Sequence, residues 1–293
     1  MNAITAPLRE LAEFEEGQAL LKKERACIGF TGCVDSQKLH MAYGLSDGFR
    51  YKIIVTFSDL KAREIYEDYQ FYDRDVTLYP AKDLIFYQAD IHGNQLVTDR
   101  MKALRKIIEG KPLTVITTFA ALMSPQVPLE EIAASVIHID GDSRLDEGSL
   151  ARSLTQMGYE KNYQVDAPGQ FSIRGGIIDI FDLTEENPYR IELWGEEVES
   201  IRSFDLLSQR SVEKLANVDI YPATEMMLSG QQKEEGLRKI EKEAKAFAGK
   251  LQESFQTEEA HRVRTQVKEL REQVQEFSQI TNLESYIRYF YEE

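Results

Sequence analysis

The chain has 293 residues, of which 42% are hydrophobic and 10% aromatic, enough for about two domains with ordinary packed cores. An excess of 50 acidic over 35 basic residues gives a formal net charge of −15, which opposes loose binding to DNA, RNA or anionic membranes. The two cysteines, Cys27 and Cys33, exclude a disulfide framework and lack the partners of a structural zinc site. Without an apolar leader or a run of about eighteen apolar residues, we expect a cytoplasmic protein without membrane contacts.

The first 25 residues read as a helical segment that leads into the first domain. Their apolar side chains Leu11, Phe14, Leu20 and Leu21 fall near one face at helical spacing. We therefore expect this segment to dock on another part of the protein.

The stretch GFTGCVDSQKLH (29–40) follows a plausible strand start and has the outline of a phosphate-binding loop. Such a loop needs the pattern Gly-x-x-x-x-Gly-Lys-Ser/Thr, so that backbone N–H groups cradle the phosphates and the Lys neutralises them. Gly29 and Ser36 fit this pattern, but Val34 replaces the second Gly and Asp35 replaces the Lys. Because the Asp35 carboxylate would repel phosphate, we expect a degenerate loop that binds no nucleotide cofactor.

An alternation of strands and helices follows this loop. Apolar runs predict strands at 51–59, 76–83 and 112–123, and helical spacing predicts helices at 60–71 and 96–110. The order strand, helix, strand, helix, strand implies a parallel sheet with helical crossovers.

The character of the sequence changes after a proline-bearing connection at 124–128. A strand at 136–140 and a short helix ended by Gly158 lead to antiparallel strands within 162–182 and 187–205. These elements predict a second, α+β domain. Residues 230–278 are strongly helical, and their apolar stripe consists of Leu237, Ile240, Ala244, Phe247 and Leu251.

Two of the predicted strands carry arginine on the face opposite to their apolar residues. Strand periodicity places Arg190, Glu192 and Trp194 opposite Ile191 and Leu193, and it places Ser172 and Arg174 opposite Phe171 and Ile173. Tryptophan and arginine are enriched among interface hot spots, so one interpretation is a protein-docking surface. The other is that a further part of the same chain covers this face.

The four histidines occur in separate segments without ligand-like spacing, and we expect them to be structural or solvated. No pattern in the sequence identifies a catalytic group or a metal site. The histidines are His40, His92, His138 and His261.

Residues 173–211 contain RGGIIDIF, then YRIELWGEEVESIRSFD, then SQR. This run resembles a block shared by the nucleotide-excision-repair protein UvrB and the bacterial transcription-repair coupling factors. Residues 98–125 also resemble the closing part of the first domain of this family, so the resemblance covers roughly residues 26–222. It implies an α/β fold class, with a degenerate RecA-like (P-loop NTPase-like) parallel-sheet domain, a smaller α+β domain and a helical segment. The implied divisions are a helical lead-in at 1–25 that packs with the C-terminal part, a RecA-like domain at 26–135, a UvrA-binding domain at 136–222 and a helical region at 223–293.

Two departures distinguish the branches of this family. UvrB carries an intact phosphate loop of the type Gly-x-Thr-Gly-Ser-Gly-Lys-Thr, of which Gly29, Thr31 and Gly32 remain here beside Val34 and Asp35. UvrB also has a long aromatic hairpin that clamps damaged DNA, and residues 79–101 are too short to form one. Both departures favour the coupling-factor branch.

The resemblance implies a recruitment module that brings UvrA to stalled transcription complexes in nucleotide excision repair. The family's UvrA-contacting positions fall on Arg174, Arg190 and Trp194, with Trp194 standing where a well-known relative has Phe. RNA polymerase and DNA would be bound only through domains absent from this chain, and ATP-driven translocation would belong to the full-length protein. The alternative is a fragment of a UvrB-like ATP-dependent helicase that recognises damage.

Overall fold

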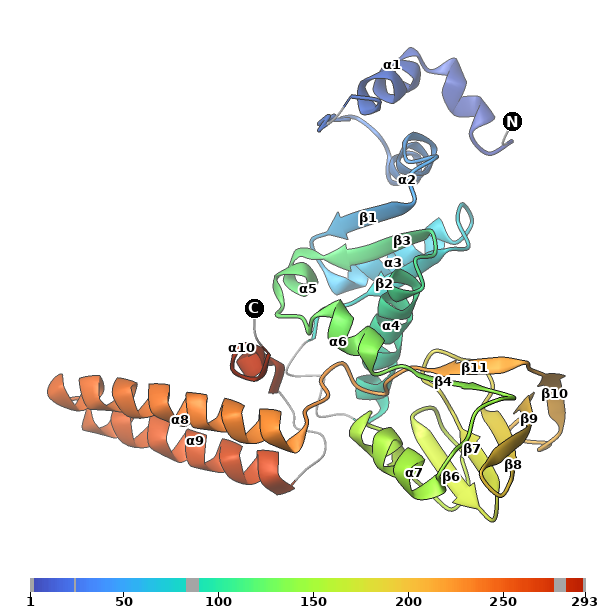
Figure 1. Cartoon of the computed structure of the whole chain (residues 1–293). Helices are drawn as coiled ribbons and strands as arrows, with labels where there is room; N and C mark the ends of the chain where they lie inside the picture. The colour runs from blue at the N-terminus through green and yellow to red at the C-terminus, as the bar shows by residue number, and fades with distance from the viewer. Residues whose placement is uncertain (1–2, 24, 83–89, 277–282, 292–293) are drawn as a thin grey trace. The chain divides into compact units, whose positions relative to one another are not determined.

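A computed structural model describes residues 3–23, 25–82, 90–276 and 283–291 (Figure 1). The chain forms two compact units, Met1–Asp83 with Lys102–Ser124, and Leu84–Met101 with Pro125–Glu293. Helix α4 (Asp90–Ile108) contributes to both. The predicted mixed α/β class is confirmed, whereas the four predicted divisions of the chain stay a prediction.

The first unit is built on a parallel sheet with the strand order β1-β3-β2. Helix α3 begins after Ser58, whose hydroxyl accepts a hydrogen bond from the Lys61 N–H at 3.2 Å. Side chains of α3 and of the sheet form the buried core, which consists of Ala62, Tyr69, Val76, Leu78 and Ile116. The predicted parallel sheet with helical crossovers is thereby confirmed. Its elements are β1 (Tyr51–Thr56), α3 (Asp59–Tyr69), β2 (Val76–Tyr79), β3 (Leu113–Thr118) and α5 (Phe119–Met123).

The N-terminal segment packs on the helix that follows the degenerate loop. Leu8, Phe14 and Met41 form a buried cluster, and the close approach there leaves no room for a side chain at Gly44, where an added Cβ would lie 2.5 Å from Leu8 Cδ1. Residues 26–34 form no strand. The elements are η1 (Ala6–Glu10), α1 (Ala12–Leu21) and α2 (Asp35–Leu45). The predicted packing of residues 1–25 with the C-terminal part stays a prediction.

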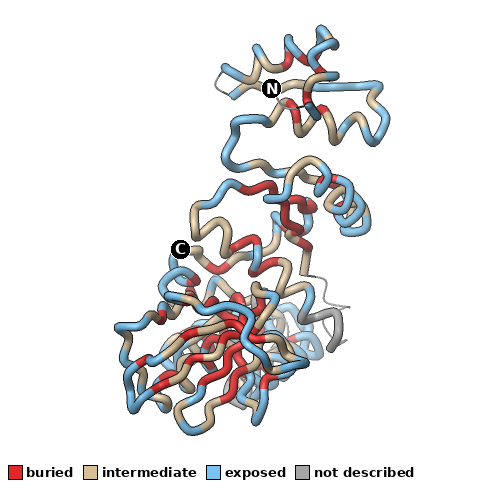
Figure 2. The backbone as a smooth tube through the Cα atoms, turned by 90° about the vertical axis from the view of Figure 1, so that its right-hand side faces the viewer, coloured by how far each residue is buried: buried red, intermediate tan, exposed pale blue. Residues whose placement is uncertain are grey.

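The second unit contains a six-stranded sheet with the order β10-β9-β8-β7-β6-β5. All neighbouring strands are antiparallel except β5 and β6, and many residues of this sheet are buried (Figure 2). Gly195, with a φ of 66°, makes the tight turn between β8 and β9. The strands are β5 (Glu160–Lys161), β6 (Gln170–Arg174), β7 (Ile177–Ile180), β8 (Tyr189–Trp194), β9 (Glu197–Phe204) and β10 (Ser211–Lys214).

A two-stranded antiparallel sheet and two short helices complete this α+β region. Helix α7 begins at Asp146, whose carboxylate accepts the Ser149 N–H at 2.8 Å, and it is followed by Gly158, which has a φ of 88°. The elements are α6 (Leu129–Ala134), β4 (Ile137–Asp140), α7 (Glu147–Gln156) and β11 (Asn217–Ile220).

The predicted helical region forms a hairpin of α8 (Gly230–Glu253) and α9 (Thr257–Glu276). Ser229 and Gln232 close a capping box at the start of α8. Of the predicted apolar stripe, Leu237 and Ile240 are buried, whereas Phe247 is exposed. Two short elements, η3 (Leu283–Tyr286) and α10 (Ile287–Phe290), follow. No helix in the described ranges is long and apolar enough to cross a membrane.

A buried ion pair anchors α4 within the second unit. Arg100, with no exposed side-chain surface, donates to both carboxylate oxygens of Glu225 at 2.6 and 3.0 Å. Gln126 bridges the pair, accepting from Arg100 at 2.9 Å and donating to Glu225 at 3.0 Å. Because the charges are paired and hydrogen-bonded, the arrangement avoids the large cost of an isolated buried charge.

Candidate protein-docking surface

The register of the six-stranded sheet brings the predicted site residues to one face. Asp179 pairs with Ser172 on one neighbouring strand and with Arg190 on the other, and residues directly opposite in register point to the same face. Arg174 lies two residues beyond Ser172 on that face. The opposite face is apolar, with Phe171, Ile178 and Ile191 fully buried.

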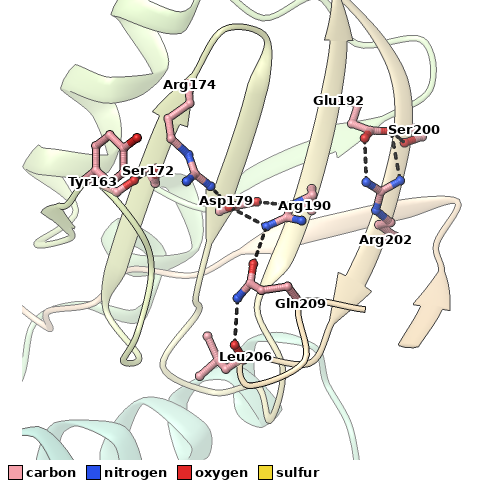
Figure 3. A network of polar contacts seen from close by, with 10 residues as sticks. All are labelled: Tyr163, Ser172, Arg174, Asp179, Arg190, Glu192, Ser200, Arg202, Leu206 and Gln209. Carbon is pink, nitrogen blue, oxygen red and sulfur yellow. Dashed lines mark hydrogen bonds and ion pairs between the residues drawn. The ribbon is translucent and has the colours of Figure 1, made fainter. Parts of the chain in front are cut away.

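One buried carboxylate holds both arginines (Figure 3). Asp179 is 1% exposed. It accepts from Arg190 Nε at 2.7 Å and Nη2 at 2.9 Å, and from Arg174 Nη2 at 2.9 Å. Two guanidinium groups share a single carboxylate, so the cluster keeps a net charge of about +1 by simple addition of its formal charges.

Arg190 is fixed by two further contacts. Its Nη2 donates to Gln209 Oε1 at 3.0 Å, and its guanidinium carbon lies 4.2 Å from the centroid of the Phe204 ring. The hydrogen bonds to Asp179 hold the pKa of Arg190 above its ordinary value. Only 14% of the Arg190 side chain is exposed, compared with 34% for Arg174. Both arginines are therefore oriented before any partner arrives.

A second ion pair lies next to this cluster. Glu192 accepts from Arg202 at 2.6 and 3.0 Å and from the Ser200 hydroxyl at 2.6 Å. The hydrogen bond from Ser200, together with the charge of Arg202, lowers the pKa of the Glu192 carboxyl. The acidic side chain on this face is thus neutralised within the sheet, which leaves the positive character of Arg174 and Arg190 uncancelled.

Exposed apolar side chains lie on β8 and in the loops next to β6 and β9. Trp194 is 80% exposed at the end of β8, and Tyr163, whose ring lies 5.6 Å from the Arg174 guanidinium carbon, is 84% exposed. Leu207, in the loop after β9, is 97% exposed. Exposed apolar groups beside fixed arginines are a composition typical of interface hot spots.

The structure brings Arg174 and Arg190 together and places Trp194 four residues along β8 from Arg190. Residues of the sheet itself largely cover Arg190, while Trp194 is open to solvent. Sequence periodicity missed Asp179, the carboxylate that binds both arginines. It also missed Gln209, which accepts a hydrogen bond from Arg190 and lies in the loop after β9.

The degenerate phosphate loop leads into the first turn of α2. Asp35 forms ion pairs with Lys38 at 2.9 Å and with Lys61 at 3.7 Å, and the hydrogen bond from Lys38 lowers the pKa of the Asp35 carboxyl. Gly32 has a φ of 79°, while Gly29, Thr31 and Ser36 are exposed. A carboxylate thus stands where a phosphate-binding loop has its Lys, and this carboxylate is already paired with two neighbouring lysines.

The histidines are the other candidate site residues of the sequence. No group of three or more potential ligands among the described residues could hold a metal ion. His40 bonds with the Ile4 carbonyl at 2.6 Å, and His138 bonds with Asp219 at 2.6 Å. The inference that 79–101 is too short for a clamp hairpin involves residues 83–89, which lie outside the described residues.

Comparisons with known proteins agree with this architecture. Residues 137–226 match the family model of the UvrB interaction domain. The transcription-repair-coupling factor of Bacillus subtilis (strain 168) is 34% identical over 241 residues, 82% of this chain and 20% of that protein. Those of Myxococcus xanthus and Staphylococcus aureus (strain Mu50) are 33% and 29% identical over 59% and 84% of this chain, and 14% and 21% of the respective relatives.

The antiparallel sheet with its arginine cluster therefore belongs to a UvrB interaction domain. The chain is a UvrB-like module, and transcription-repair-coupling factors are similar to it over most of its length. It spans about one fifth of the length of the Bacillus subtilis and Staphylococcus aureus relatives.

Proposed function

We propose that this chain recruits UvrA to stalled transcription complexes in nucleotide excision repair, and that UvrA binds the face formed by Arg174, Arg190 and Trp194. The observation that carries the proposal is the orientation of both arginines by the buried Asp179, beside a tryptophan that is 80% exposed. Groups held in place before binding lose little conformational freedom on association, and guanidinium groups suit bidentate contacts with partner carboxylates.

Binding to RNA polymerase and DNA, together with ATP-driven translocation, would lie in other parts of a full-length protein. The size of the relatives, of which the chain matches about one fifth, supports this division of labour. The net charge of −15 also opposes direct binding of the fragment to DNA.

The decisive experiment is a titration of UvrA with the wild-type chain and with Trp194→Ala. Because Trp194 is exposed, its truncation should leave the melting temperature unchanged while weakening UvrA binding by about 30-fold or more, the range of a hot-spot residue. Phe71→Ala is the matched control, since Phe71 is an aromatic residue of the first unit that is 83% exposed. Wild-type affinity in Trp194→Ala and in Arg190→Ala would overturn the proposed surface.

The second candidate function is a fragment of a UvrB-like ATP-dependent helicase. Its supporting observation is the retained outline of the phosphate loop, with Gly29, Gly32 and Ser36 in place. We propose instead that the module binds no nucleotide, because Asp35 replaces the cation and is itself paired with Lys38. A titration with a fluorescent ATP analogue separates the two, and saturable micromolar binding that ATP displaces would favour the helicase.

A further inference from the structure

We infer that the loop formed by residues 205–210, between β9 and β10, is part of the same docking surface. In this arrangement Leu207 is an apolar contact for the partner, and Gln209 is a positioning residue that holds Arg190. The inference rests on the proposed function of this face, and it adds Leu207 and Gln209 to the three UvrA-contacting positions that the resemblance implies.

The loop is a closed, hydrogen-bonded turn. The Asp205 carboxylate accepts from the Ser208 N–H at 2.8 Å and from the Ser208 hydroxyl at 2.6 Å. The Asp205 N–H donates to the Arg210 carbonyl at 2.9 Å, and the Gln209 N–H donates to the Asp205 carbonyl at 2.8 Å. A loop fixed in this way holds Leu207 at 97% exposure, so a partner that buries this side chain pays little to order the backbone.

Gln209 connects the loop to the arginine cluster. Its Oε1 accepts from Arg190 Nη2 at 3.0 Å, and its Nε2 donates to the Leu206 carbonyl at 2.8 Å (Figure 3). The residue has a φ of 58°, a conformation that costs free energy for any residue other than glycine. A strained glutamine that bonds simultaneously to its own loop and to Arg190 suggests a function in orientation rather than in folding.

The hydrogen bonds also define the chemistry of the partner. Arg190 uses Nε and Nη2, and Arg174 uses Nη2, in their bonds to Asp179 and Gln209. The Nη1 groups of both arginines make no hydrogen bond among the described residues and can donate to a partner. The loop follows β9 at the end where β8 begins, whereas Trp194 ends β8. The face therefore fits a partner with acidic oxygens opposite the arginines and apolar groups on either side.

The test is to measure UvrA affinity and melting temperature for two loop variants. Leu207→Asp should weaken binding about tenfold or more, because it replaces an apolar contact with a charge that would be buried against apolar groups of the partner. Gln209→Gly should weaken binding by about threefold to tenfold while the melting temperature is retained or raised, because glycine adopts the positive φ without strain. Weaker binding of Gln209→Gly at an unchanged or raised melting temperature would show that Gln209 positions Arg190. A purely structural role would instead lower the melting temperature.

Leu60→Asp is the control, since Leu60 is a leucine of the first unit that is 72% exposed. The loop inference would be overturned if Leu207→Asp and Gln209→Gly bound UvrA as tightly as wild type while Trp194→Ala bound it weakly. That result would leave the proposed function standing. Unchanged binding in Trp194→Ala and Arg190→Ala as well would overturn both. Should Leu207→Asp unfold, the smaller change Leu207→Ala, with at least a threefold loss expected, decides the question.

Discussion

Asp179 and Arg190 face each other across strands β7 and β8 and form a two-point ion pair, with Arg190 Nε 2.7 Å from Oδ1 and Nη2 2.9 Å from Oδ2. The carboxylate of this pair is almost completely buried, while the arginine reaches the surface. The same contact therefore stabilises the interior of the sheet and orients a guanidinium group that is only partly exposed.

Asp179→Asn should destabilise the chain by about 3 kcal/mol, because removing one partner of a buried ion pair leaves the other without compensation. Urea denaturation monitored by circular dichroism measures the change. Arg144→Gln is the control, since its ion pair with Glu197 is mostly exposed and exposed pairs contribute little. Equal stabilities of Asp179→Asn and Arg144→Gln would contradict the structural importance of the cluster.

Trp194 is the sole tryptophan of the chain, so its fluorescence reports on the docking surface alone. Because the side chain is 80% exposed, the emission maximum of the folded chain should lie close to that of the urea-unfolded chain, with similar quenching by acrylamide. A chain labelled with 5-fluorotryptophan should then show one ¹⁹F resonance that shifts when UvrA is added. A strongly blue-shifted emission in the free chain would mean that another segment already covers Trp194.

Two glycines of α8 should respond in opposite directions to alanine. Alanine is normally favoured over glycine within a helix by about 1 kcal/mol, and Gly249→Ala should gain about this amount because nothing lies within 4 Å of the added Cβ. Gly236→Ala should instead destabilise the chain, since its Cβ would clash with the buried ring of Phe290. Thermal unfolding of the two variants provides the comparison, and stabilisation by both would exclude the close packing of α10 on α8.

The Glu192 ion pair predicts a loss of stability in acid. The hydrogen bond from Ser200 and the charge of Arg202 lower the pKa of Glu192 below its ordinary value of 4.5. A carboxyl whose pKa is lower in the folded chain stabilises the fold fully above pH 4.5, and this contribution disappears as the pH falls through the folded-state pKa. The stability advantage of wild type over Glu192→Gln should therefore shrink below pH 4.5 in urea titrations. A constant difference down to pH 3 or so would contradict the lowered pKa.

Periodicity alone predicted which residues share a face of the sheet. Successive side chains of a strand alternate between the two faces, so Arg190 and Trp194 had to lie opposite Ile191 once a strand was recognised. Asp179 could not be assigned in this way, because a lone carboxylate in the run IIDIF reveals nothing about its partners. Its role depends on the register between β6, β7 and β8, which joins residues that are separate in the sequence.

Local patterns were also insufficient where an element depends on a distant neighbour. The residues just before Gly29 read as a plausible strand start, but residues 26–34 form no strand, and a strand requires a hydrogen-bonded partner that local sequence does not reveal. The role of Gln209 is similarly hidden, because the SQR motif that contains it does not show what its side chain contacts. Its importance comes from the positive φ and the bond to Arg190, neither of which a propensity predicts.

The buried ion pair between Arg100 and Glu225 limits where the chain can be truncated for expression. The match to the UvrB interaction domain covers residues 137–226, a segment that includes Glu225 but neither Arg100 nor Gln126. A fragment with those ends would lose the cation and the amide that compensate its carboxylate. The match to the family is thus one continuous segment, but the folding unit is not, and an expressed fragment needs α4 as far as Arg100, together with Gln126, to keep Glu225 paired.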